Sequence, residues 1–149
     1  MQVHTLLKGL EKIAASADIP MLVVGDFNSM PGSAAHSLLT KGRVEPGHVE
    51  LKNDPLGILQ PAGKLAHQLP ICSAYSRGPK DILGEYSEPR WTNFSREFKG
   101  TIDYIFYTQG SLEPVALLEI SEPMYEGPLP NVTWSSDHIA LGSEFVYNK

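Results

Sequence analysis

The chain has 149 residues, of which 42% are hydrophobic and 19% are charged, and its formal net charge is −5. These values fit one globular domain with a core of its own and exclude a disordered chain. The negative charge argues against a protein that coats nucleic acid by bulk electrostatics, but it does not exclude a nuclease whose carboxylates bind cations. No stretch reaches the roughly 18 to 20 apolar residues that span a bilayer, so we predict no membrane partner.

The N-terminal segment and the cysteine content indicate an intracellular protein. Residues 1–16 are too polar for a secretory signal peptide. Cys72 is the single cysteine, so one chain can form neither a disulfide framework nor a cysteine-based zinc site. Both features favour a reducing compartment, and we expect the protein in the cytoplasm, with the nucleus as a second location.

The first forty residues have the pattern of a helix, a buried strand and a second helix. In residues 2–17 apolar side chains recur at helical spacing, which predicts an amphipathic helix. Residues 20–26, PMLVVGD, form a continuously apolar run that is typical of a central, parallel-type strand covered on both faces. Ser33 can cap a second helix through Leu39, which the Lys41-Gly42 pair would stop. This order is typical of an α/β domain.

The middle of the chain predicts loops and then strands. From Gly42 to Arg90 proline and glycine recur, which indicates surface loops with one short helix. Residues 90–95 and residues 99–108, KGTIDYIFYT, are predicted strands, the second of them rich in β-branched and aromatic residues. Residues 112–120, LEPVALLEI, are expected to form the neighbour of that second strand.

The last part of the chain predicts a long loop and a final strand. Residues 121–136 contain three prolines and are interpreted as a loop. In residues 137–147 apolar side chains alternate, so that Ile139, Leu141 and Phe145 would share one face of a strand.

Polar side chains stand at three places where a predicted strand begins or ends. Asp26 and Asn28 follow the first strand, although an Asp-x-Asn pair is most often a turn, because both side chains accept backbone hydrogen bonds. Asp103 stands among Ile, Tyr and Phe, where an unpaired carboxylate would be costly. It needs a partner, and His138, which follows Asp137 at the start of the last strand, is a suitable one.

A sheet could gather these positions at one rim. Carboxylates, an amide and an oriented imidazole, without a candidate serine or cysteine nucleophile, suit metal-assisted phosphoryl chemistry. Hard oxygen ligands favour Mg²⁺ or Mn²⁺ over zinc. We therefore predict a Mg²⁺ or Mn²⁺ site.

Three motifs, GDFNSMPGS, KGTIDYIFY and WSSDHIAL, in this order resemble the endonuclease/exonuclease/phosphatase superfamily, which has the DNase I-like fold. The segments NDPLGILQPAGKLAHQLPICSAYS and FKGTIDYIFY further resemble the carbon-catabolite-repression type of poly(A) deadenylase. The likeness extends over essentially the whole chain. It implies a metal-dependent phosphodiesterase, and most specifically a 3′-to-5′ poly(A) exoribonuclease of mRNA decay.

The resemblance implies a role for each matching position. Asp26 would position the attacking water, and Asn28 would hold a phosphate oxygen or a second metal ion. Asp103 would orient the imidazole of His138, which would stabilise charge on the pentacoordinate phosphorus. The implied catalytic residues are thus Asp26, Asn28, Asp103 and His138, and the implied metal ligands are Asp26, Asn28, Asp137 and His138.

The resemblance also implies contacts with the poly(A) tail of an RNA. Asn28, Asn93 and Phe98 would bind this substrate, with Phe98 stacked on an adenine. An ordinary core or turn aromatic explains Phe98 equally well. Three basic residues nearby could contact backbone phosphates, although solvated surface charge is the more ordinary interpretation: Arg90, Arg96 and Lys99.

The implied fold is a four-layer α/β sandwich, of which this chain would hold one half: an α/β (α+β) unit with mainly one β-sheet and flanking helices. We interpret residues 1–149 as the C-terminal part of the domain, with its N-terminal half absent. That half would supply an Asn and the Glu that is the principal Mg²⁺ ligand, so we expect this chain to be weak or inactive alone. Its uncovered sheet face could lead to self-association.

Other functions fit the same motifs. Members of the superfamily also act on abasic DNA, phosphoinositides and dinucleotides, so the substrate could differ while the fold stays. A non-catalytic half-domain that acts through contacts with other proteins, such as those of a deadenylase complex, is an alternative of another class.

Overall fold

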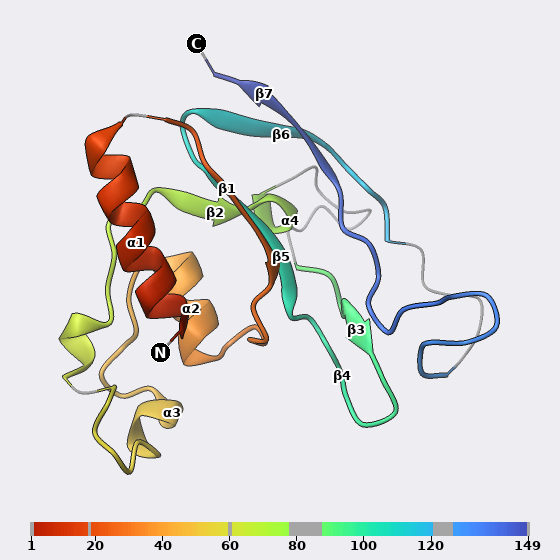
Figure 1. Ribbon diagram of the computed structural model, residues 1–149, viewed down its shortest axis with the longest axis horizontal. Coiled ribbons are helices and arrows are strands. Elements are labelled where there is room, and N and C mark those ends of the chain that lie inside the picture. The colour runs from red at the N-terminus through yellow and green to blue at the C-terminus, as the bar shows by residue number, and fades with distance from the viewer. Residues whose placement is uncertain (1, 18, 60, 78–87, 121–126, 149) are drawn as a thin grey trace.

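The computed structural model describes residues 2–17, 19–59, 61–77, 88–120 and 127–148, which form an α/β arrangement (Figure 1). The helices are α1 (Gln2–Ser16), α2 (Ala34–Lys41), α3 (Val49–Lys52), the short 3-10 helix η1 (Ala62–Lys64) and α4 (Ala74–Arg77). The strands are β1 (Leu22–Asp26), β2 (Ile71–Ser73), β3 (Asn93–Phe94), β4 (Lys99–Gly100), β5 (Asp103–Thr108), β6 (Leu112–Leu117) and β7 (Ser143–Tyr147).

β5 is the middle strand of the main sheet, whose order is β1-β5-β2 with both pairs antiparallel. Its β-branched and aromatic residues favour extended backbone. The register places Leu22 opposite Tyr107 at one end of the β1–β5 pair and Asp26 opposite Asp103 at the other. Two carboxylates therefore lie side by side at one end of the sheet.

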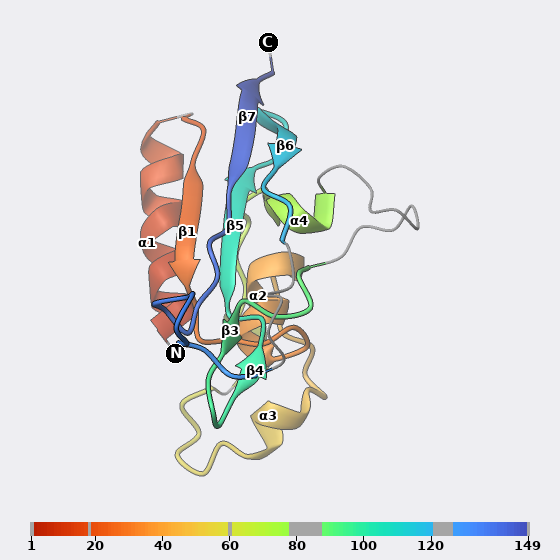
Figure 2. The same cartoon turned by 90° about the vertical axis from the view of Figure 1, so that its right-hand side faces the viewer.

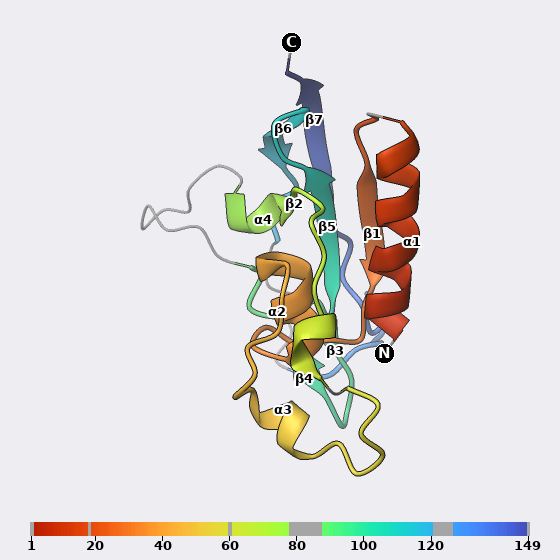
Figure 3. The same cartoon turned by 90° about the vertical axis from the view of Figure 1, so that its left-hand side faces the viewer.

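The helices α1 and α2 pack against one face of this sheet (Figures 2 and 3). Leu7 of α1 and Leu39 of α2 are fully buried there with Phe106 of β5. The apolar spacing of residues 2–17 thus produces the predicted helix, and its apolar stripe supplies one side of the core.

The ends of α2 lie where the sequence predicts them. The Ser33 hydroxyl accepts the His36 N–H at 3.1 Å and so caps the first turn. Gly42 ends the helix with a φ of 72°, a left-handed conformation that glycine adopts without strain. Its N–H donates to the Leu38 carbonyl.

β1 is not the doubly covered central strand that its sequence predicts. It is an edge strand of the described sheet and pairs antiparallel with β5. Val23 is buried, whereas Leu22 and Val24 are 52% and 60% exposed. An apolar run indicates apolar side chains on both faces of a strand, but not which layers cover them. The exposed pair forms the uncovered apolar face that we expected, and self-association through it remains a prediction.

The later strands also differ from the prediction. Residues 99–108 divide into β4 and β5. At the junction of the two strands, the N–H groups of Ile102 and Asp103 both donate to the Thr92 hydroxyl, at 3.0 Å each, and not to a neighbouring strand. The prediction that residues 112–120 neighbour β5 was wrong, since β6 pairs with β7. Both edges of β5 are already occupied, by β1 and β2, so β6 finds its partner elsewhere.

Short or irregular segments account for the remaining differences. The sequence did not predict β2, because a strand of three residues is too short to show an alternation of apolar and polar side chains. β7 begins at Ser143 and not at position 137, since His138 instead forms an isolated bridge with Asn93. Of the predicted loop, residues 121–126 lie outside the described part of the chain, and residues 127–136 contain neither helix nor strand. No helix among the described residues is long and apolar enough to cross a bilayer.

We expect the substitution Leu39→Ala to lower the free energy of unfolding by about 3 kcal/mol, because it leaves a cavity between α2 and the sheet. Urea titration followed by circular dichroism measures the change. The matched control is Leu56→Ala, at a side chain that is 78% exposed, which should change stability by less than about 0.5 kcal/mol. Equal effects at the two positions would contradict this core.

Candidate active site

The antiparallel register of β1 and β5 brings Asp26 and Asp103 together. Asp26 ends β1 and is exposed, whereas the Asp103 side chain is 18% exposed at the start of β5. The Oδ1 atom of Asp26 also accepts the backbone N–H of Asn28 at 2.7 Å. Asn28 has a positive φ of 48°, so the chain turns sharply just after the carboxylate. Asp26 and Asn28 thus form a turn, as their sequence suggested, and Asp26 also belongs to a cluster of possible metal ligands.

His138 completes this cluster. Its Nδ1 atom lies 2.9 Å from the Oδ2 atom of Asp103, which confirms the predicted pairing of the two side chains. Ligand atoms of Asp26, Asp103 and His138 all lie within 4.8 Å of one another. The two carboxylates offer the hard oxygen ligands that Mg²⁺ and Mn²⁺ prefer, so they fit the predicted metal, whereas an imidazole nitrogen is a ligand more typical of zinc.

Thr92 connects the segments that carry Asp103 and His138. Its hydroxyl accepts the N–H of Asp103, and its carbonyl accepts the N–H of Ile139 at 2.8 Å. Thr92 is fully buried, so these hydrogen bonds are shielded from water. Sequence reasoning missed this residue, because a threonine in a predicted strand is ordinary.

Asn93 and Asp137 form a second polar pair beside the cluster. The Asn93 side-chain amide donates to the Oδ2 atom of Asp137 at 3.0 Å, and this hydrogen bond lowers the pKa of the Asp137 carboxyl below its usual range. Asn93 is 5% exposed. The predicted roles of Asn93 in substrate binding and of Asp137 at the metal remain predictions.

Phe98 lies next to the loop that follows β1. A Cβ atom built on Gly100 would meet the Phe98 ring at 2.9 Å and the end of the Met30 side chain at 3.2 Å. Gly100 therefore leaves the space that the half-buried Phe98 ring occupies. Whether this ring stacks on a base remains a prediction.

Three basic side chains were predicted near the site. The Lys99 ammonium lies 4.2 Å from the ring centroid of Phe94 and 5.2 Å from that of Trp91, so this lysine makes cation–π contacts. Arg90 and Arg96 are exposed.

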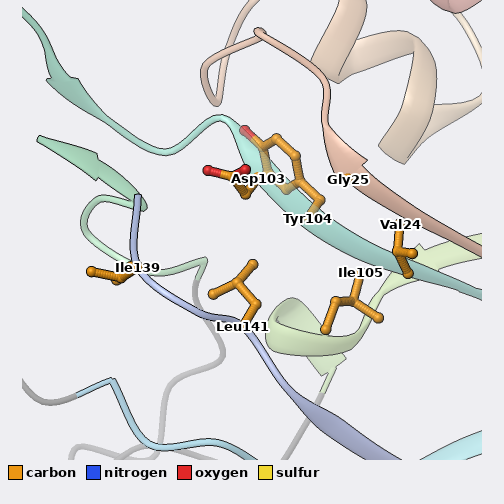
Figure 4. A pocket seen from close by; sticks show the side chains of 7 residues that line it. All are labelled: Val24, Gly25, Asp103, Tyr104, Ile105, Ile139 and Leu141. Atoms are coloured by element: carbon orange, nitrogen blue, oxygen red, sulfur yellow. The ribbon is translucent and has the colours of Figure 1, made fainter. Parts of the chain in front are cut away.

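A hollow of about 290 Å³ adjoins the cluster, on the sheet face that carries the exposed Val24 side chain (Figure 4). Figure 4 shows the Asp103 carboxylate at one end, between β5 and the segment that leads to β7. The lining is mostly apolar and consists of Val24, Gly25, Asp103, Tyr104, Ile105, Ile139 and Leu141.

Charges around His138 favour its protonated form. Partial burial opposes protonation, but the hydrogen bond and charge of Asp103, with the charges of Asp137 and Asp26, outweigh it and raise the pKa of His138 above its usual 6.5. Because the folded-state pKa is raised, this interaction stabilises the fold fully below about pH 6.5 and is lost as pH rises through the folded-state pKa.

The chain is similar to proteins of known families. The model of the Endonuclease/Exonuclease/phosphatase family matches residues 2–138. Carbon catabolite repressor protein 4 homolog 1 of Arabidopsis thaliana is 55% identical over 97% of the chain. The CCR4-Not complex 3′-5′-exoribonuclease subunit Ccr4 of Aspergillus niger is 38% identical over 89% of it. The chain spans 26% of the length of the plant relative and 19% of that of the fungal one.

Two solved structures have the same fold. ANGEL2, a 2′,3′-cyclic phosphatase in complex with adenosine-2′,3′-vanadate, matches with a TM-score of 0.69 and 28% identity, over 97% of this chain and 50% of that one. The catalytic domain of human Nocturnin matches with a TM-score of 0.62 and 24% identity, over 99% of this chain and 40% of that one, a likeness that shows the fold alone. The predicted α/β fold of DNase I type is confirmed.

We expect the substitution Asp103→Asn to lower the pKa of His138, because a neutral amide replaces the carboxylate that favours the imidazolium. NMR titration of the imidazole protons in metal-free buffer measures this pKa. Asp137→Asn is the matched control, since it removes a charge near His138 but keeps the Asp103 hydrogen bond, and its effect should be smaller. An unchanged pKa in Asp103→Asn would contradict the described pairing.

Proposed function

This chain belongs to the Endonuclease/Exonuclease/phosphatase family, and we propose that it carries the catalytic edge of a metal-dependent 3′-to-5′ poly(A) exoribonuclease. The observation that carries the proposal is the cluster of Asp26, Asp103 and His138, whose ligand atoms lie within 4.8 Å of one another. Paired carboxylates with an oriented imidazole suit hydrolysis of a phosphodiester.

The choice of RNA as substrate rests on the similar proteins. The fungal relative is named a 3′-5′-exoribonuclease, and the plant relative shares 55% of its aligned residues with this chain. We carry this activity to the present chain as a proposal, together with an adenine contact at Phe98 and phosphate contacts at Asn28 and Asn93.

Each side chain at the site would have a separate role in phosphodiester hydrolysis. Asp103 accepts the Nδ1–H of His138, which leaves Nε2 available to donate to a phosphate oxygen as negative charge develops on it. Asp26 would orient the attacking water, and Asn28, on the turn after it, would hold a phosphate oxygen. A Mg²⁺ or Mn²⁺ ion held by Asp26, with Asp137 and His138 nearby, would supply electrophilic stabilisation of the same charge.

We also propose that the cluster is an incomplete metal shell. Mg²⁺ prefers octahedral coordination with several oxygen ligands, and the family resemblance implies a glutamate from the N-terminal part of the fold. The present chain would then be the C-terminal part of the domain, and its activity alone would be weak. The 50% coverage of the ANGEL2 chain is consistent with this proposal.

A second candidate is hydrolysis of a 2′,3′-cyclic phosphate. The likeness to ANGEL2, which is described as a 2′,3′-cyclic phosphatase, favours it at 28% identity. The same carboxylates and imidazole could serve this reaction, so substrate comparison must decide between the two.

The proposed activity also suggests partners and a location. The fungal relative is a subunit of the CCR4-Not complex, and we propose that the present protein works with proteins of a deadenylase complex. Its substrate would then be mRNA, in the cytoplasm or the nucleus.

We expect Asp26→Asn to weaken Mn²⁺ binding at least about tenfold, because the cluster loses a negative charge and an anionic oxygen ligand. Electron paramagnetic resonance of free Mn²⁺ during titration measures the affinity and does not depend on catalysis. Glu113→Gln removes an exposed carboxylate of β6 and serves as the charge-matched control. Equal affinities in the wild type and Asp26→Asn would contradict the metal site.

We expect the wild-type chain to shorten a 5′-labelled, A-tailed RNA stepwise from its 3′ end in Mg²⁺, at less than about 1 s⁻¹, and His138→Ala to lose this activity. Gel electrophoresis separates the products. Parallel reactions use an RNA that ends in a 2′,3′-cyclic phosphate. Preference for the cyclic phosphate would replace the first candidate by the second, and rapid shortening would contradict the incomplete shell.

A further inference from the structure

A tryptophan lies at the edge of the cluster, on the loop that leads to His138. The Trp134 side chain is 39% exposed, and its indole N–H donates to the backbone carbonyl of His138 at 2.9 Å. Its ring is therefore fixed within one hydrogen bond of the residue whose imidazole completes the cluster. Trp134 is the first residue of the WSSDHIAL motif, but no role described above uses its side chain.

The loop that carries Trp134 is closed at its base by one residue of β3. The N–H of Phe94 donates to the Asp137 carbonyl at 2.8 Å, and the Phe94 carbonyl accepts the N–H of Leu129 at 2.7 Å. Leu129 is 3% exposed and packs with the apolar cluster of Trp91. Both ends of the loop are thus held against β3, from which the loop extends in Figure 1.

The tip of the loop is a turn with its own hydrogen bonds. The side-chain oxygen of Asn131 accepts the N–H and the hydroxyl of Thr133, at 2.9 Å each, and the N–H of Trp134 at 3.0 Å. The Asn131 N–H in turn donates to the Trp134 carbonyl at 2.8 Å. The indole is therefore exposed in a fixed place, and a planar ligand would bind it with little loss of conformational freedom.

A positive charge lies at the base of the same loop. The exposed ammonium group of Lys99 is 4.2 Å from the ring centroid of Phe94, the residue that closes the loop. Proteins that bind single-stranded nucleic acid combine aromatic rings, on which bases stack, with cations that meet the phosphates. The loop and Lys99 together offer both.

We propose that Trp134 is a stacking platform for a nucleobase of single-stranded RNA whose phosphate lies at the cluster. The inference rests on the proposed function and adds a second base contact, at Trp134, to the one predicted at Phe98. Since every base has a π-face, this platform contributes affinity and no selectivity for adenine. Trp134 is then a binding residue, while its N–H contact with His138 serves to hold the ring.

Two variants separate stacking from the hydrogen bond. Trp134→Phe keeps an aromatic face and loses the N–H, whereas Trp134→Leu loses both. Binding of a fluorescein-labelled adenosine oligonucleotide in EDTA, measured by anisotropy, gives the affinity without turnover. We expect Trp134→Phe to bind within about twofold of wild type and Trp134→Leu to bind about tenfold more weakly. Tyr147→Leu, at an aromatic side chain of β7 that is 76% exposed, is the control and should bind like wild type.

Intrinsic fluorescence supplies a measurement that does not depend on the folding of the leucine variant. The chain has two tryptophans, and the other one, Trp91, is 6% exposed. We expect the oligonucleotide to quench wild-type emission, and this quenching to be lost in Trp134→Phe, which retains only Trp91.

Each other outcome overturns the inference. Equal weakening in the phenylalanine and leucine variants would assign the effect to the N–H contact with His138, and wild-type affinity in both, without quenching, would leave no role for the ring. Both results would keep RNA binding and so the proposed function. If the wild type bound no oligonucleotide of any sequence, the proposed function itself would fail, and the platform with it.

Discussion

The antiparallel pairing of β1 with β5 places two carboxylates directly opposite each other, an arrangement that costs stability in an ordinary sheet because like charges repel. The fold compensates in two ways. Asp26 lies at the exposed end of its strand, and Asp103 is bound to an imidazole whose raised pKa favours a positive charge. The remaining negative charge is available for a cation. The geometry of the pairing and the chemistry of the site are therefore consequences of one register.

The register of β1 and β5 places only the two carboxylates. The imidazole of the cluster comes from His138, which belongs to neither strand. Thr92 connects the segment with His138 to β5: its hydroxyl accepts the N–H of Asp103, and its carbonyl accepts the N–H of Ile139. Asn93, the next residue, bridges to His138 and binds Asp137 through its side chain. A two-residue stretch thus sets the distance between β5 and the last part of the chain. Because these contacts connect the backbone of Asp103 to that of the segment with His138, changes in them would move the imidazole relative to Asp103.

Features that depend on contacts between residues close in the sequence were predictable from it. Features that depend on contacts between distant segments were not. Ser33 and Gly42 define the ends of α2 through contacts within one turn, and Asp103 stood out because a carboxylate in an apolar strand needs a partner. The pairing of β6 depended on both edges of β5 being occupied, and the exposure of Val24 depended on which layers cover β1. Neither is encoded in a short pattern. Trp134 stands in the WSSDHIAL motif, but its hydrogen bond to the His138 carbonyl appears only in the folded chain.

The hydrogen bond between the Asn28 N–H and the Asp26 carboxylate gives Asp26 a structural role in addition to its place in the cluster. Asn28 has a left-handed backbone, which a side-chain-bearing residue adopts at a cost, and the carboxylate helps to hold it there. The same carboxylate is one of the two that meet at the end of the β1–β5 pair. One side chain thus serves both the turn after β1 and the cluster, so that the sequence cannot change at position 26 for the benefit of one without altering the other.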